Sequence, residues 1–172
     1  MPTRIEEMSL SALGVCLIIL MLAIVAQVVC SALDLNPVIV FDSAIALAGE
    51  AITLNSLLDF QWHLLVIVGL TPAGLVWMMD RHVRVDFLHQ RQSRRVQARI
   101  DLLGNALFAA PFFALSLPAA WSFLERAWAS DEGSRNAGLN DLWLIKAVLP
   151  FGLGLLALAV LLESWRLRRD VW

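Results

Sequence analysis

Charged side chains are scarce in this sequence. Asp, Glu, Lys and Arg make up 16% of the 172 residues, 59% of the residues are hydrophobic, and the mean hydropathy is +0.72. A soluble domain usually carries about a quarter charged residues, so a medium other than water must solvate this surface. The scarcity argues against a water-soluble enzyme, and the formal net charge of −2 supplies no basic surface for nucleic acid. The composition indicates an integral membrane protein.

Cysteine is nearly absent. The only two, Cys16 and Cys30, stand 14 residues apart in one apolar run. A helix would separate their Cα atoms by about 21 Å, whereas a disulfide needs about 7 Å or less. We therefore expect no disulfide, and both cysteines are interpreted as small packing residues.

Charge is also excluded from four long runs of the sequence. These runs are 8–33, 60–79, 102–124 and 142–162, the last interrupted only by Lys146. A helix needs about 20 apolar residues to cross a hydrocarbon core of about 30 Å, and lipid offers no partner to an unpaired backbone group. The whole chain is thus predicted to form one all-α membrane domain. Its four transmembrane helices are expected over about 9–32, 61–79, 101–124 and 142–163.

The arginines predict the orientation of these helices. They gather in the connection over 80–99 and near the two termini, whereas the connection between the first two spans has none. Basic residues stay on the cytoplasmic side of a membrane. We therefore expect cytoplasmic termini and a cytoplasmic loop over 80–99. Tryptophans near the predicted span ends are typical of an interfacial belt: Trp62, Trp77, Trp128, Trp143 and Trp165.

The connection between the first two spans is too apolar for an ordinary loop. At 100° per residue over about 42–57, one side collects polar residues such as Asp42 and Glu50, and the other collects mainly alanine, isoleucine and leucine. This pattern predicts an amphipathic helix lying in the membrane interface, with its acidic side toward the periplasm. The alternative is a short buried helix, in which both carboxylates would be costly.

The predicted spans lack the groups that carry catalysis or ion transport. They contain no paired carboxylates, metal-ligand cluster, nucleophile with its base or glycine-rich phosphate loop. We therefore expect no catalytic, cofactor-binding or metal-binding residues, and no transport by this chain alone. A haem anchor would need histidines on facing helices. The sequence has only His63, His82 and His89, and the first two lie at opposite ends of one span.

Lys146 is the one full charge inside a predicted span. It lies, with Trp143, one turn inside the outer boundary, so its amine can extend toward the surface. Glu125 and Asp141 are the expected partners. Two interpretations stay open: Lys146 is an interfacial anchor, or it forms an ion pair with another subunit.

Three segments in order and spacing resemble a known family. Gln61-Trp62-His63-Leu64 opens the second span, Asp80-Arg81-His82-Val83-Arg84-Val85-Asp86 follows it, and Gly138-Leu139-Asn140-Asp141-Leu142-Trp143-Leu144-Ile145-Lys146-Ala147 leads into the fourth. Together they resemble the small Q-type (DctQ-like) membrane subunit of tripartite ATP-independent periplasmic (TRAP) transporters. The long connection between the first two spans resembles the mannitol/chloroaromatic-compound or 2-oxoacid branch. Residues 136–141 depart from the Pro-Gly-Gly-Leu-Pro-like turn of the family.

The resemblance implies a non-catalytic scaffold in the bacterial inner membrane. A large M-type subunit would move the solute, driven by a sodium gradient, and a periplasmic P-type binding protein would deliver an organic acid or similar solute. This chain would pack along the M-type subunit, contact membrane lipid and help the P-type protein to dock. The alternative from another class is a stand-alone four-helix membrane anchor of a redox or sensor complex.

The resemblance also implies structural or partner contacts at three places. They are the outer start of the second helix, packed against the interfacial helix, the inner turn into the third helix, and the outer start of the fourth. The candidate residues are Gln61, Trp62, His63, His82, Arg84, Asp86, Trp143 and Lys146. An equally open interpretation is that these residues stabilise only the fold of this subunit.

Overall fold

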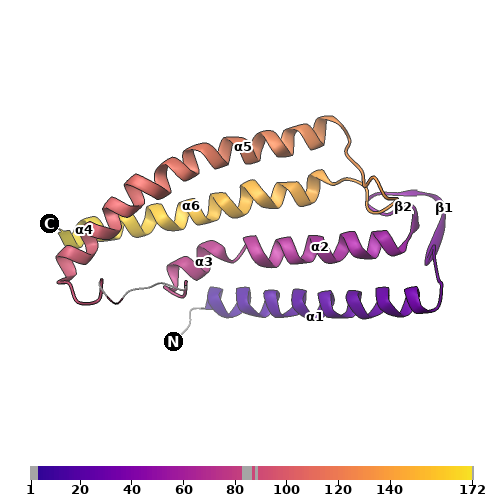
Figure 1. The fold of residues 1–172 in the computed structure, drawn as a ribbon, viewed down its shortest axis with the longest axis horizontal. Coiled ribbons are helices and arrows are strands. Elements are labelled where there is room, and N and C mark those ends of the chain that lie inside the picture. The colour runs from indigo at the N-terminus through magenta and orange to yellow at the C-terminus, as the bar shows by residue number, and fades with distance from the viewer. Residues whose placement is uncertain (1–3, 83–86, 88, 172) are drawn as a thin grey trace. The chain divides into compact units, whose positions relative to one another are not determined.

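Helices form most of the computed structural model, which describes residues 4–82, 87 and 89–171 (Figure 1). The elements in order are α1 (Arg4–Ala32), β1 (Ile39–Ile45), β2 (Gly49–Ile52), α2 (Leu54–Leu70), α3 (Ala73–Met78), α4 (Arg94–Gly104), η1 (Asn105–Ala109), α5 (Ala110–Ala129) and α6 (Trp143–Val171). In this described part of the chain, four helical stretches are long and apolar enough to cross a membrane: Glu7–Ala32, Leu54–Met78, Arg94–Ala129 and Trp143–Arg169. The prediction of a mostly helical protein with four spans is confirmed.

The chain divides into two compact units. The first consists of Met1–Leu70 and Ser122–Val148, and the second of Thr71–Trp121 and Leu149–Trp172. The first unit holds α1, the two strands, α2, the end of α5 and the start of α6. The second holds α3, α4, η1 and the larger parts of α5 and α6.

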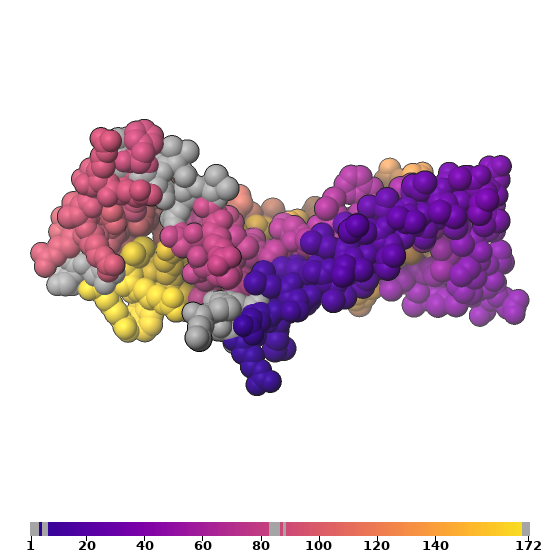
Figure 2. All heavy atoms as spheres, turned by 90° about the horizontal axis from the view of Figure 1, so that it is seen from below, coloured from indigo at the N-terminus to yellow at the C-terminus, as the bar shows by residue number. Residues whose placement is uncertain are grey.

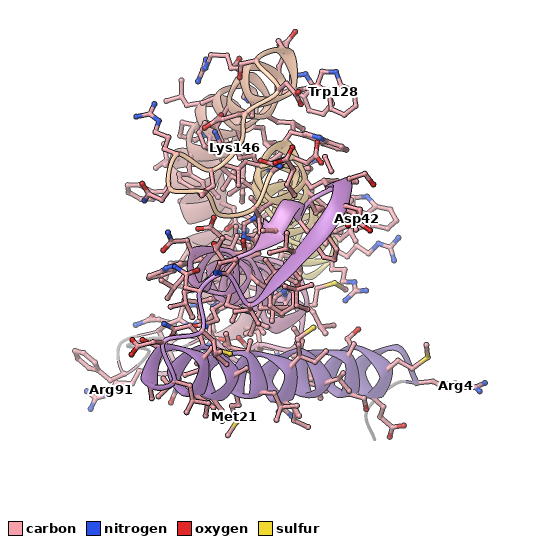
Figure 3. The ribbon with its side chains drawn as sticks, turned by 90° about the vertical axis from the view of Figure 1, so that its right-hand side faces the viewer. Arg4, Met21, Asp42, Arg91, Trp128 and Lys146 are labelled. Atoms are coloured by element: carbon pink, nitrogen blue, oxygen red, sulfur yellow. The ribbon has the colours of Figure 1, made fainter. Side chains whose placement is uncertain are left out.

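In the first unit, α1 packs along α2 and is otherwise uncovered. Ala23 is buried on the packed side, and the Nε2 of Gln61 on α2 donates a hydrogen bond to the Ala23 carbonyl oxygen at 3.3 Å. The opposite side carries large apolar residues such as Met21, 66% exposed, which points away from the other elements of the unit (Figure 3). Figure 2 shows this side of α1 (indigo), over which no other element of the first unit lies. Such a surface is stable only against lipid or another protein.

Strands replace the interfacial helix that was predicted over 42–57. β1 and β2 form an antiparallel hairpin that pairs Ile39 with Ile52 and Ile45 with Gly49. The prediction is wrong for residues 42–52, because Leu47 and Gly49 have positive φ angles of 70° and 65°, which end any helix there. The small alanines gave the segment its helical pattern, while the β-branched residues at the strand ends favour pairing.

Prolines interrupt the regular helices. α2 ends at Leu70 and α3 begins only after Pro72, because the proline nitrogen has no hydrogen to donate. Before Pro111, η1 is a wider turn in which the Ala110 N–H bonds to the Asn105 carbonyl oxygen. A single π turn of this kind lets a helix continue past a residue that cannot make its regular hydrogen bond.

The second unit has close contacts between α3 or η1 and α6. A Cβ atom on Gly74 would lie 2.8 Å from the carbonyl oxygen of Leu155, so α3 approaches the α6 backbone there. The Nε1 of Trp77 donates to a carboxylate oxygen of Glu163. The side-chain amide of Asn105 donates to the Oγ of Ser164 at 2.9 Å. These bonds fix α6 with polar groups that would otherwise be unpaired.

Candidate functional site

Polar groups of the first unit gather where the hairpin, the start of α2 and the connection between α5 and α6 meet. We call residues 39–59 and 130–142 the polar end; Asp42 of β1 lies in it (Figure 3). The connection 130–142 has little regular structure of its own. Its backbone hydrogen bonds must therefore be satisfied by the elements around it or by water.

The tip of the hairpin binds the connection through a reciprocal pair of hydrogen bonds. The Asn140 N–H donates to the Leu47 carbonyl oxygen at 2.7 Å, and the Leu47 N–H donates to the Oδ2 of Asp141 at 3.1 Å. Gly49 is buried beneath the Asn140 side chain, where a Cβ atom would lie 2.7 Å from its amide nitrogen. The connection and the hairpin turn therefore hold each other in position.

The start of α2 is capped and then joined to the same connection. The Thr53 N–H donates to the Ser56 Oγ and the Ser56 N–H donates to the Thr53 Oγ1, both at 3.2 Å, which is a reciprocal capping arrangement. The Oγ1 of Thr53 also donates to the Ala137 carbonyl oxygen at 2.7 Å, and the side-chain amide of Asn55 donates to the Asn136 carbonyl oxygen at 2.6 Å. Two backbone carbonyl oxygens of the connection thus accept hydrogen bonds from Thr53, directly before α2, and Asn55, in its first turn.

Asp59 and Gly138 form the tightest contact of the polar end. The Oδ2 of Asp59 accepts the Leu139 N–H at 3.0 Å. A Cβ atom on Gly138 would lie 1.9 Å from that oxygen and 2.6 Å from the Oγ of Ser134. Only glycine fits at position 138 while the carboxylate keeps this hydrogen bond.

Lys146 pairs with Glu132 inside the same chain. Its Nζ lies 2.5 Å from the Oε2 of Glu132 and 4.2 Å from the ring centroid of Phe123. The side chains of Lys146 and Glu132 are 17% and 40% exposed. The prediction of Glu125 or Asp141 as the partner is wrong, because the connection folds back and brings Glu132 to the start of α6.

The tryptophan rings beside this pair also meet. The rings of Trp128 on α5 and Trp143 on α6 lie 4.4 Å apart between centroids at an interplanar angle of 78°. Edge-to-face packing of this kind is favourable beyond the area that it buries. Figure 3 labels Trp128 and Lys146 at this end of the first unit.

The three remaining candidates at the start of the second span differ in their hydrogen-bond partners and in their exposure. Gln61 bonds to α1 rather than to the segment 42–57, and the Nδ1 of His63 bonds to the Asp59 carbonyl oxygen of its own helix. Trp62 is 64% exposed. Of these three residues, Trp62 is the one whose surface is available to a partner.

The candidates after the second span lie in the second unit or outside the description. The Nε2 of His82 is 3.2 Å from the Ala73 carbonyl oxygen, and its ring lies 5.6 Å from that of Trp77. His82 therefore folds back onto α3. Arg84 and Asp86 fall outside the described residues.

Sequence reasoning missed the polar contacts of the polar end. Asp59 offered a signal, because a carboxylate directly before an apolar run needs a donor at the membrane boundary. Its donor lies about 80 residues later, in a connection without periodicity. The contributions of Thr53, Asn55 and Asn140 carried no comparable signal.

The described fold is that of a four-span membrane protein with a polar end built from hairpin, capped helix and connection. The sequence matches, over residues 44–170, the family described as "Tripartite ATP-independent periplasmic transporters, DctQ component", and the chain belongs to this family. The match includes α2 to α6 and most of the polar end, and leaves α1 outside. No curated protein matches the chain.

Membership makes the chain a small membrane component of a TRAP transporter. The family acts with a large membrane subunit and a periplasmic binding protein. It is a family of transporter components, generally not of enzymes.

Proposed function

We propose that this chain is the scaffold subunit of a sodium-gradient-driven TRAP transporter. A large M-type subunit would move an organic acid or similar solute, delivered by a P-type periplasmic binding protein. The observation that carries the proposal is the exposure of the spans: in their most apolar windows at most 22% of the residues are buried within the chain. Surfaces of this extent and apolarity fit a subunit that lies between lipid and a larger membrane protein.

The charge distribution supports a supporting role rather than a transporting one. The ammonium group of Lys146 is paired with the Glu132 carboxylate and lies over the Phe123 ring, so its charge is already balanced within the chain. Ion pathways instead use ionisable groups that face a water-filled cavity. We assign movement of sodium and solute to the M-type subunit.

For the orientation, we propose cytoplasmic termini in the bacterial inner membrane. The polar end then lies on the periplasmic side, where the P-type protein would meet it. The arginine distribution supports this assignment, as does α4, which begins with Arg94 and Arg95. We also propose the mannitol/chloroaromatic or 2-oxoacid branch, because the connection before α2 is long enough to hold a hairpin.

Purification of the tagged chain from its native membrane in mild detergent tests the scaffold. We expect a large multispanning permease to co-purify in stoichiometric amount, identified by mass spectrometry. If the helical chain runs alone, the scaffold proposal fails and the stand-alone membrane anchor becomes the better explanation.

Sodium coupling needs a separate test in vesicles. The purified complex and its binding protein are reconstituted, and uptake of a radiolabelled 2-oxoacid is followed with an inward sodium gradient or an equal potassium gradient. We expect accumulation with sodium only. Equal uptake under both gradients would contradict sodium coupling without affecting the scaffold role.

A further inference from the structure

The second unit contains a long apolar groove that the scaffold role does not use. Its volume is about 450 Å³, and its two walls are α4–η1–α5 and α6. The first wall runs from Leu102 to Leu117 and the second from Ala157 to Arg168, and the lining residues of each wall recur in a helical i, i+3, i+4 pattern. Each wall is therefore one continuous helix face.

Alanines line much of the groove, and their small side chains leave space between the two walls. They are Ala106, Ala109, Ala110, Ala114 and Ala157. At about 1.5 Å per residue the lining faces are about 20 Å long. Spread over this length and widened by the radius of a water molecule, about 1.4 Å, on each side, this volume corresponds to a channel about 8 Å across, whereas a helix with side chains is about 10–12 Å across. The groove is wide enough for a hydrocarbon chain and too narrow to enclose a helix of a partner.

One end of this groove is lined by a cationic side chain. Arg168 lines the groove one turn beyond Ser164, is exposed, and forms no ion pair with any residue that the structure describes. Ser164 is already engaged by Asn105, and the neighbouring Arg169 lies over the Trp165 ring at 4.4 Å. Among the residues that line the groove, Arg168 is thus the one whose positive charge is available to a ligand.

The position of Arg168 along α6 matches the level of lipid headgroups. The uncharged run of α6 ends at Leu162, and six further residues advance a helix by about 9 Å. The headgroup layer lies several ångströms beyond the hydrocarbon core. Helical side chains lean toward the N-terminus, so the guanidinium extends back toward the groove.

We propose that this groove binds a membrane phospholipid, with one acyl chain between α5 and α6 and the anionic phosphate paired with Arg168. An apolar channel with a single cation at its mouth is complementary to such an amphiphile in both shape and charge. Basic pockets between transmembrane helices are known to hold lipid headgroups. The proposal concerns this chain alone and does not depend on the transport partners.

The test is native mass spectrometry of the full chain in detergent, titrated with phosphatidylglycerol. We expect Arg168→Gln to weaken binding about fivefold, while the matched control Arg166→Gln, on the same helix outside the groove, changes it less than twofold. Ala114→Phe fills the channel and should abolish the bound lipid. Ala119→Phe, an exposed alanine of the same helix that does not line the groove, should retain it. Circular dichroism establishes that every variant keeps its helicity.

A second measurement identifies the occupant in the membrane. The photo-reactive substitution Ala114→p-benzoylphenylalanine is irradiated in intact membranes, and the adduct is weighed. A phospholipid adduct supports the proposal. A protein adduct would show that a partner covers the groove, and equal phosphatidylglycerol binding by Arg168→Gln and Arg166→Gln would remove the headgroup site; either result overturns the proposal.

Discussion

The ammonium group of Lys146, in the first turn of α6, lies 2.5 Å from the carboxylate of Glu132, which belongs to the connection before that helix. The Leu142 N–H donates to the Glu132 carbonyl oxygen at 2.9 Å, so the backbone brings the carboxylate there independently of the charge. The ion pair therefore holds the connection 130–142 against the start of α6.

Loss of either charge should destabilise the first unit. We expect Lys146→Met and Glu132→Gln each to lower the free energy of unfolding by about 1–3 kcal/mol, because each leaves a partly buried partner unpaired. The double variant should lose less than the sum of the two. Thermal unfolding of the purified chain in detergent measures all three, with the exposed Glu125→Gln as the control. Additive losses would show that the two charges do not interact.

Gly138→Ala should open the polar end. The added methyl group would overlap the Asp59 carboxylate at 1.9 Å, so the hydrogen bond to Leu139 must break or the connection must move. We expect a loss of about 2 kcal/mol and faster hydrogen exchange at the Leu139 amide. Gly14→Ala in α1, where no atom lies within 4 Å of the new Cβ, should be neutral or stabilising. Equal effects of the two variants would contradict the tight contact.

Gly74→Ala should loosen α3 from α6 within the second unit. Its Cβ atom would lie 2.8 Å from the Leu155 carbonyl oxygen, and backbone cannot give way as a flexible side chain can. We expect a lower unfolding temperature in detergent, equivalent to about 1–3 kcal/mol. Gly154→Ala on α6 has open space around the new Cβ and serves as the control. An unchanged unfolding temperature for Gly74→Ala would contradict the close approach.

Trp62→Ala tests partner contact apart from folding. Trp62 is 64% exposed, so its loss should hardly change the stability of the isolated chain. If it contacts the large subunit, the yield of that subunit in a pull-down should fall several-fold, while the apparent affinity for the solute stays constant. Trp121→Ala, at 62% exposure, is the matched variant. Equal yields for both would assign Trp62 to lipid.

The four spans could be predicted because lipid imposes one simple requirement on sequence, a long run without charge. The hairpin could not, because the alanine-rich segment has a local pattern that favours a helix. The turn of the hairpin is instead supported by hydrogen bonds between Leu47 and two residues more than 90 positions later, Asn140 and Asp141. Long-range contacts of this kind leave no local trace.

The candidate site could be predicted only in part for the same reason. Lys146 was identifiable as an unusual charge, but its partner Glu132 was not, since it sits in a connection without regular structure. Gln61 was identifiable from the resemblance, yet its bond runs to the Ala23 backbone, which any residue at position 23 would offer. The sequence thus identifies residues of an unusual type more readily than it identifies the atoms that those residues contact.

At the polar end, the connection offers mainly backbone atoms to its neighbours. Thr53 and Asn55 bond to the carbonyl oxygens of residues 137 and 136, and Asp59 accepts the N–H of residue 139. The side chains of Asn136 and Ala137 are exposed and take no part in these bonds. Position 136 can therefore vary without altering the path of the chain, whereas position 137, whose φ is 53°, is restricted to residues that tolerate a left-handed backbone. The exposed surface can thus diverge at one position while the backbone framework beneath it stays the same.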